Sequence, residues 1–291
     1  MSDSSECGSP TITTQGCALC DPKKKYFNCI CGKNWNTFEE HLNILTNLSH
    51  PLISKSVTVS TMTLCADFKS HVDLSILAEK YQDTIKYSPL SKKSKNNKSK
   101  KDCFYNSLLM TMTTKYQAKP SISVKFFPNG KIQIAGCNTI RACCYSLRKA
   151  FNRLLNNNCF MEEGYEISDA KIVMINTDFK INTLINQESL TQVLSTKTVD
   201  KNYNYPQVVY QSSKYPGINA KFIPDKKLEE YSKFFLIHGH AKKYPGIISM
   251  LIFRPGSIII TGGNEIEDYI EATTNILTIL QENKNEVTYS C

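Results

Sequence analysis

The 291-residue sequence lacks long hydrophobic runs. No apolar stretch approaches the roughly 18 residues that a membrane-spanning helix needs. The run IISMLIF, which begins at Ile247, is among the longest. The first ten residues, MSDSSECGSP, are polar and acidic and do not have the pattern of a secretory signal. We therefore expect a protein that is not secreted and has no membrane partner.

Recognisable catalytic motifs are also missing. The sequence contains no P-loop, no HExxH, no GxSxG and no dinucleotide-binding glycine pattern. It has five histidines, and none lies in a pattern with a nucleophile. The carboxylates of NEIEDYIE (264–271) fit the solvated face of a helix. These absences favour a binding protein over an enzyme.

The overall composition is that of a globular protein with an anionic partner. Hydrophobic residues make up 41% and aromatic residues 10% of the chain. Thirty-five basic side chains outnumber 26 acidic ones and give a formal charge of +9, which favours a partner such as nucleic acid. Without a secretory signal, the twelve cysteines indicate reduced thiols in the cytosol or nucleus.

The first 50 residues form a cysteine-rich extension that differs from the rest of the chain. They contain five cysteines and the single tryptophan, Trp35. A CxxC pair followed by a CxC pair has enough thiolates for one structural Zn²⁺, and His41 and His50 are substitutes for one pair. The alternative is a loosely ordered arm with ordinary thiols, and no other cofactor is required. The candidate zinc ligands are Cys17, Cys20, Cys29 and Cys31.

One segment occurs twice in the sequence in similar form. FFPNGKIQIAGCNTI begins at Phe126, and IFRPGSIIITGGNEI begins at Ile252. Aligned without gaps from Ser123 and Ser249, eight of 18 positions are identical. A helical pattern follows each copy, and a strand-like segment (VTVSTMTLCADF or AKIVMINTDF) precedes each. We predict two similar units, 51–160 and 161–291, with a solvated lysine-rich insertion at 92–101.

Each copy predicts a β-hairpin that turns at Gly130 or Gly256. Alternation places one set of side chains against the following helix: Val124, Phe126, Ile132 and Ile134, and in the second copy Met250, Ile252, Ile258 and Ile260. The opposite face carries Lys125, Phe127, Gln133 and Ala135, and in the second copy Leu251, Phe253, Ile259 and Thr261. In an antiparallel sheet with one solvent-exposed face, apolar and polar residues alternate along each strand. The second copy is apolar on both faces, so another layer, a dimer partner or a ligand must cover it.

These segments resemble the repeated signature of the TATA-box-binding protein family. The matching residues are F-x-x-G-K-I-x-I-x-G-C from Phe127 and F-x-x-G-S-I-I-I-T-G-G from Phe253. YPGINAKF (215–222) resembles the family's stirrup segment, and SLRKAFNRLL (146–155) resembles its basic helix. The resemblance covers roughly residues 52–282 in both copies, and the insertions are typical of a viral or protist relative.

The resemblance implies an α+β saddle with pseudo-two-fold symmetry. A curved antiparallel sheet of about ten strands would carry helices on its convex face. The concave face would lie in the minor groove of A·T-rich duplex DNA, which the family bends by about 80°. A single-copy accessory domain of a nucleic-acid enzyme and a protein-binding module with the same fold are the alternatives.

The resemblance also assigns site residues. The DNA-intercalating side chains would be Tyr105, Phe127, Tyr215 and Phe253, and each has the alternative of a core residue. The minor-groove face would contain Val57, Val59, Lys125, Gln133, Ala135, Ile172, Leu251, Ile259 and Thr261. Phosphate contacts would come from Lys131, Arg148 and Lys149, for which an ordinary solvated side chain is the alternative.

Three departures from the family pattern affect function. The family's base-contacting asparagines align with Val57 and Ala170, which puts strict TATA preference in doubt. Lys125 and Gln133 replace aliphatic residues in the first copy only, so unequal halves would orient the protein on DNA. The segment YQSSKYPG (210–217) has no acid to bind the general factor that follows the family onto promoters. We therefore expect an adapted partner, either RNA polymerase or a factor of that type. The expected location is the nucleus or cytoplasm of the host cell, or a viral factory or virion for a viral protein.

Overall fold

The computed structural model describes residues 34–81, 85–88, 107–118, 121–199, 204–238, 244, 246–263 and 265–289. Predictions for Cys17, Cys20, Cys29, Cys31, Tyr105 and the lysine-rich insertion fall outside these residues. Among the described residues, no helix has the length and apolar character to cross a membrane. No three metal-ligating side chains gather in the described part of the chain.

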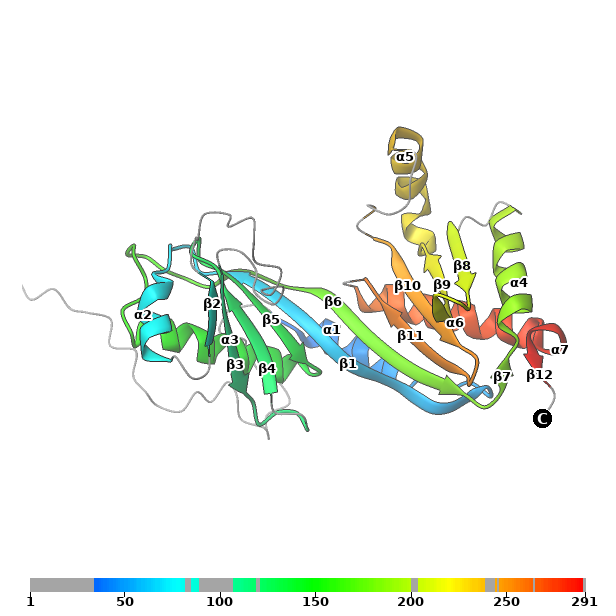
Figure 1. The fold of residues 1–291 in the computed structure, drawn as a ribbon, viewed down its shortest axis with the longest axis horizontal. Helices are drawn as coiled ribbons and strands as arrows, with labels where there is room; N and C mark the ends of the chain where they lie inside the picture. The colour runs from blue at the N-terminus through cyan, green and yellow to red at the C-terminus, as the bar shows by residue number, and fades with distance from the viewer. Residues whose placement is uncertain are drawn as a thin grey trace, which may run out of the picture.

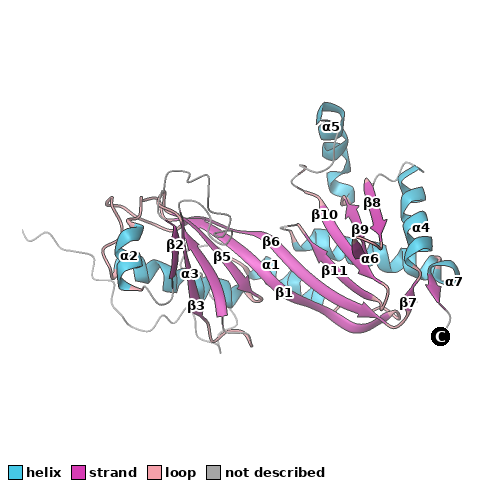
Figure 2. Ribbon diagram, viewed as in Figure 1, coloured by secondary structure: helices cyan, strands magenta, loops and turns pink. Residues whose placement is uncertain are grey.

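A ten-stranded antiparallel sheet, which curves along its length, is the centre of the fold (Figures 1 and 2). Its strand order is β2-β3-β4-β5-β1-β6-β11-β10-β9-β8. One half contains β1 (Ile53–Asp67), β2 (Ile85–Ser88), β3 (Ser107–Thr113), β4 (Ser121–Phe126) and β5 (Lys131–Cys137). The other contains β6 (Ser168–Ile181), β8 (Gln207–Gln211), β9 (Tyr215–Phe222), β10 (Ile248–Phe253) and β11 (Ser257–Thr261). The predicted α+β class with about ten strands is confirmed.

The helices lie around the sheet (Figure 1). They are α1 (Asn36–Thr46), α2 (Leu74–Lys80), α3 (Ile140–Leu155), α4 (Gln187–Val199), α5 (Leu228–His238), α6 (Ile266–Glu282) and α7 (Lys284–Val287). Of these, α1, α3 and α6 lie behind the strands as drawn in Figure 1. A short 3-10 helix, η3 (Asp225–Lys227), precedes α5, and a small second sheet pairs β7 (Leu184–Ile185) with β12 (Thr288–Tyr289). Helix α5 projects away from the body (Figure 1).

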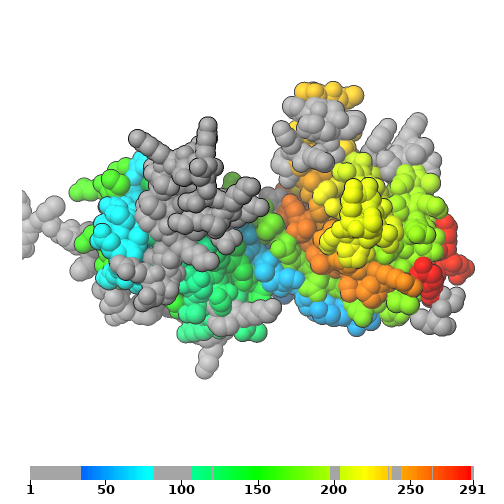
Figure 3. All heavy atoms as spheres, in the orientation of Figure 1, coloured from blue at the N-terminus to red at the C-terminus, as the bar shows by residue number. Residues whose placement is uncertain are grey.

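The two halves are joined along their first strands. β1 has 15 residues and β6 has 14, and they pair antiparallel from Ile53 opposite Ile181 to Asp67 opposite Ser168. The remaining strands then follow in mirrored order on either side of this pair. The space-filling view narrows between the halves, where β1 and β6 run (Figure 3). The two units occur in the predicted order, and the division between 160 and 161 stays a prediction.

The alternation predicted for the two hairpins is confirmed. Cross-strand pairs such as Val124 with Ile134 and Met250 with Ile260 are buried on the side of α3 and α6. Each member of the two predicted helix-facing sets is at most 1% exposed. Helix α3 begins after Thr139, whose side chain accepts a hydrogen bond from the amide of Ala142 at 3.0 Å. Apolar burial against these two helices therefore fixes which face of the sheet remains open.

Part of the predicted N-terminal extension belongs to the folded body. Helix α1 packs against α6 and β1 and buries Trp35 and Leu45. His41 Nδ1 lies 2.8 Å from Glu267 Oε1 on α6. His50 Nδ1 accepts a hydrogen bond from the amide of Leu52 at 3.2 Å. His41 and His50, the alternative ligands predicted for zinc, thus contact α6 and the residue before β1, respectively.

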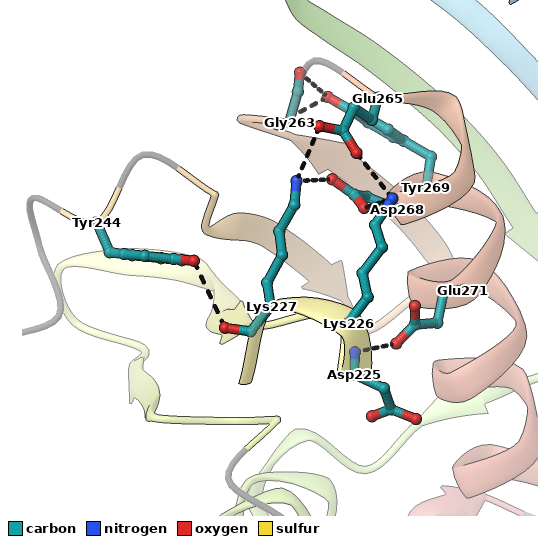
Figure 4. Close-up of polar contacts among 9 residues, drawn as sticks. All are labelled: Asp225, Lys226, Lys227, Tyr244, Gly263, Glu265, Asp268, Tyr269 and Glu271. Atoms are coloured by element: carbon teal, nitrogen blue, oxygen red, sulfur yellow. Dashed lines mark hydrogen bonds and ion pairs between the residues drawn. The ribbon is translucent and has the colours of Figure 1, made fainter. Parts of the chain in front are cut away.

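A buried ion-pair cluster fixes η3 to the start of α6 (Figure 4). The Asp268 side chain is fully buried, with Lys227 Nζ 2.5 Å from Oδ2 and Lys226 Nζ 3.1 Å from Oδ1. Lys226 also donates to Glu265 at 2.7 Å, which holds the pKa of the Glu265 carboxyl below its ordinary value. Because a buried carboxylate is costly without partners, these two lysines fix the orientation of the segment leading into α5.

Glycine is required at the hairpin turn Gly256 for two reasons, positive φ and close contact, whereas Gly164, in the loop before β6, has positive φ alone. Gly256 has a φ of 81°, and a Cβ there would lie 2.7 Å from Thr183 O and 2.8 Å from Ile181 O. Gly164 has a φ of 77°, but a Cβ there would meet nothing within 4 Å. We expect Gly164→Ala to lower the free energy of unfolding by about 1 kcal/mol through backbone strain alone. Gly256→Ala should lower it by at least about 2 kcal/mol, because the backbone must also move.

Urea denaturation followed by circular dichroism measures both effects. Equal losses in the two variants would show that the contact of the Gly256 turn with Ile181 and Thr183 adds nothing to stability.

Candidate nucleic-acid interface

The sheet has an open face, defined here as the face opposite α3 and α6. Strand pairing arranges its side chains in rows that run across the sheet. The repeat-one row contains Leu109, Lys125, Gln133, Cys65 and Lys171. The repeat-two row contains Val209, Asn219, Leu251, Ile259, Asp178 and Thr58. The 126-residue offset makes Lys125 equivalent to Leu251 and Gln133 equivalent to Ile259, and the mirrored strand order matches the remaining positions of the two rows.

Six residues predicted for the minor-groove face lie on the open face. All six are half-buried, whereas their neighbours along each strand are fully buried on the helix side. They are Lys125, Gln133, Ala135, Leu251, Ile259 and Thr261. At matching positions the open face thus presents Lys125 and Gln133 in the first repeat but Leu251 and Ile259 in the second.

The placement predicted for Val57, Val59 and Ile172 is wrong. Val57 is 1% exposed and Ile172 is 4% exposed, and both belong to the hydrophobic core. Val59 is partly buried against the same core. The pairing of β1 with β6 shifts register at several points, including between Val59 and Thr61. Because side chains alternate with a period of two, each such irregularity changes which residues reach the open face.

The second hairpin ends in an aromatic pair. The rings of Phe253 and Tyr215 have centroids 5.9 Å apart, and Tyr215 is 43% exposed. Gly217 pairs with Phe253 across β9 and β10, and a Cβ on Gly217 would lie 2.9 Å from the Phe253 ring. Glycine at this position therefore gives the two rings their space. The structure brings together two of the four predicted intercalating residues.

The first hairpin has the same turn. The amide of Gly130 donates to Phe127 O at 3.1 Å, as the amide of Gly256 does to Phe253 O at 3.0 Å. Phe127 is half-buried, like Phe253, and Gly130 has a φ of 79°. The partner predicted for Phe127, Tyr105, lies outside the described residues.

The predicted phosphate-binding residues lie in different places. Lys131 is exposed beside the first hairpin turn. Arg148 and Lys149 lie on α3, on the other side of the sheet from the open face. Lys149 Nζ donates to Thr113 O at 3.0 Å, and burial together with Arg153 lowers the pKa of its ammonium group. Only Lys131 of the three lies at an end of the open face.

An asparagine that sequence alignment missed lies near the centre of the open face. Asn176 on β6 pairs with Thr61 and Thr261 in the neighbouring strands. Its side-chain amide donates to Thr61 Oγ1 at 2.8 Å, and its Oδ1 accepts from Thr261 Oγ1. The resemblance to the family aligned its asparagine with Ala170, six residues earlier on the same strand. Alternation along MINTDF (174–179) was the signal that could have found Asn176.

The same alternation places a carboxylate two residues further along. Asp178 Oδ1 accepts from Ser60 Oγ at 2.5 Å and from Thr58 Oγ1 at 3.0 Å, and Oδ2 lies 2.8 Å from Lys55 Nζ. Burial alone would raise the pKa of Asp178, but the hydrogen bonds from Lys55, Ser60 and Thr58 outweigh it and lower the pKa. The open face therefore carries an ionised carboxylate at neutral pH. No sequence prediction included it.

Phe127 and Phe253 are less buried than the core phenylalanine Phe126, and this difference predicts different effects on stability. Phe126 is 1% exposed in the core, and Phe127, the next residue, is half-buried. We expect Phe126→Ala to lower the free energy of unfolding by about 3–5 kcal/mol. Phe127→Ala and Phe253→Ala should lower it by less than about 1.5 kcal/mol, since these rings lose little burial. Chemical denaturation measures the three values, and a loss at Phe127 as large as that at Phe126 would place Phe127 in the core instead.

Comparisons with known proteins find a curated viral relative and solved structures, among them an archaeal one. The chain is 24% identical over 278 residues to a TATA-box-binding protein-like protein of Acanthamoeba polyphaga mimivirus, and the match covers 84% of this chain and 70% of that protein. The solved structure of Methanococcus jannaschii TBP aligns with a TM-score of 0.49 and 15% identity over 78% of this chain and 98% of that one. No family model matches the sequence. The predicted resemblance to the TATA-box-binding protein family is confirmed by the viral relative.

Proposed function

We propose that this protein binds and bends duplex DNA through the minor groove at promoters and recruits transcription machinery. It acts as a binding protein and not as an enzyme. The observation that carries this proposal is the open face, where half-buried apolar side chains lie between two similar hairpin ends that each carry a phenylalanine. The name of the mimivirus relative supports the same function.

The open face suits a minor groove that has been widened. Leu251 and Ile259 are adjacent on neighbouring strands and form a flat apolar surface that DNA sugars can cover. Phe127 and Phe253 lie at the two hairpin ends, where each ring can enter a base step and unstack it. Unstacking costs a few kcal/mol per step, and the contacts that the bent duplex gains offset it.

Charge supplies the general attraction. The chain carries a formal charge of +9, and Lys125, Lys131 and Lys171 lie on or beside the repeat-one half of the open face. Each lysine that neutralises a phosphate releases counterions, so that affinity falls as salt rises. Because the repeat-two half has Leu251 and Ile259 at the matching positions, the unequal halves favour one orientation on DNA.

The recruited partner must differ from a factor that binds acidic residues at the second stirrup. The turn between β8 and β9 has Gln211, Ser213 and Lys214 and no carboxylate. We propose an adapted general factor, or the polymerase itself, as the protein partner. Zinc binding by the four N-terminal cysteines remains a separate proposal, as does location in the nucleus, the cytoplasm or a viral factory.

Bending is tested by energy transfer between fluorophores at the two ends of short duplexes. Wild-type protein should raise the transfer efficiency on an A·T-rich duplex more than on a G·C-rich one, because the A·T-rich duplex is the expected partner. The rise should fall as salt increases from 50 to 200 mM. Phe127→Ala and Phe253→Ala should each remove most of the rise, because one wedge is lost in each.

Phe38→Ala is the matched control, because Phe38 lies on α1, away from the open face. It should bend DNA like the wild type, and circular dichroism should show that all three variants fold. Binding without bending would overturn the bending function. A failure to bind any duplex would overturn DNA binding and favour a protein ligand on the open face.

A further inference from the structure

The two equivalent rows of the open face differ in charge: the repeat-one row has two lysines, whereas the repeat-two row has one carboxylate, with Asn219 and Thr58 as its other polar side chains. The repeat-one row has donors in Lys125, Gln133 and Lys171. At the repeat-two position equivalent to Cys65 lies Asp178, whose carboxylate only accepts hydrogen bonds. Two apolar side chains, Leu251 and Ile259, precede it in the row. A ligand that spans both rows therefore meets lysine donors in the repeat-one row and a carboxylate acceptor in the repeat-two row.

Asp178 is held in place and still has acceptor capacity. Ser60 and Thr58 both donate to Oδ1, and Lys55 is the one donor to Oδ2 among the residues that the structure describes. A carboxylate oxygen accepts about two hydrogen bonds, so Oδ2 has room for one more donor. The side chain is 32% exposed and the Lys55 side chain is 58% exposed. Three hydrogen-bond donors fix the carboxylate in one orientation on the face that the proposed function assigns to DNA.

The minor groove contains a single kind of donor. A·T pairs present only the acceptors adenine N3 and thymine O2, whereas a G·C pair adds the guanine N2 amino group. Against an A·T pair the Asp178 carboxylate keeps its ion pair with Lys55, but the base edges offer it only acceptors, which repel it, and its remaining acceptor site gains no donor from the DNA. Against a G·C pair, the same carboxylate accepts a hydrogen bond from the guanine amino group.

We propose that Asp178 is a specificity-determining residue that accepts a hydrogen bond from the N2 amino group of one guanine in the minor groove. The inference rests on the proposed DNA-binding function. It assigns this protein a target with a G·C pair facing repeat two, within an otherwise A·T-rich site facing the donors of repeat one. A single preferred guanine also gives the complex a direction on DNA.

Base analogues that add or remove only the purine N2 amino group in the minor groove test the proposal. A set of A·T-rich duplexes has one G·C pair moved step by step through the site. Inosine then replaces guanine and removes only the N2 amino group. Wild-type protein should bind one position of the G·C pair best, and inosine there should weaken binding about fivefold to tenfold. Adding an amino group by 2,6-diaminopurine·T at the same position should restore the affinity.

Variants assign the effect to Asp178. Asp178→Ala removes both acceptors and should make the protein indifferent to inosine while it still binds the A·T-rich duplex. Asp178→Asn removes the charge and should bind an A·T pair at that position more tightly than wild type does. Asp169→Asn is the matched control, because Asp169 is an exposed carboxylate on the same strand, ion-paired to Lys69, and asparagine tolerates its φ of 50°. It should behave like the wild type.

The outcomes separate this inference from the proposed function. Tight binding to the duplexes with no dependence on the N2 amino group at any position overturns the role of Asp178 alone. Guanine dependence that persists in Asp178→Ala does the same. A protein that binds none of the duplexes overturns both proposals.

Discussion

The antiparallel pairing of β1 with β6 is the constraint on which the rest of the structure depends. It joins the first strand of each repeat over most of the 15 and 14 residues of these strands. The other strands then extend outward in mirrored order, so that one continuous sheet forms instead of two separate ones. Because the repeats share a sheet, α3 and α6 cover the same side and leave a single long open face.

Burial acts differently on the two sides of this sheet. On the helix side, both repeats use large apolar residues such as Phe126 and Ile252, since any polar group there would lose water without a partner. On the open side, equivalent positions have diverged from Lys125 to Leu251 and from Gln133 to Ile259. The symmetry of the fold is therefore not a symmetry of its chemistry. A partner that lies along the open face meets Lys125 and Gln133 in one half and Leu251 and Ile259 at the matching positions of the other.

Much of the hairpin geometry could be predicted from the sequence, because the repeat aligns without gaps and side chains alternate regularly. The central strands could not be predicted in the same way. Alternation along 174–179 places Asn176 and Asp178 on the face opposite the buried Ile175 and Thr177, but Val57 and Ile172 lie in the core where the pairing of β1 with β6 shifts register. These shifts depend on the pairing of residues more than 100 positions apart, which local alternation does not reveal.

The contacts of the N-terminal segment with α6 could not be predicted from sequence patterns either. Helix α1 has no counterpart in the second repeat, and its packing depends on the shape of α6. The same applies to the burial of Asp268 between Lys226 and Lys227, because charges in a sequence usually indicate a solvated surface. Patterns that repeat along the chain were predictable, and contacts unique to one half were not.

The central claim is that the open face, and not the helix side, meets duplex DNA. Photo-cross-linking tests it most directly, with a benzophenone side chain placed at Leu251 on the open face or at Thr274 on the exposed side of α6. The account predicts cross-links to an A·T-rich duplex from position 251 and none from position 274. Cross-links from position 274 alone would contradict it and place the duplex on the helix side.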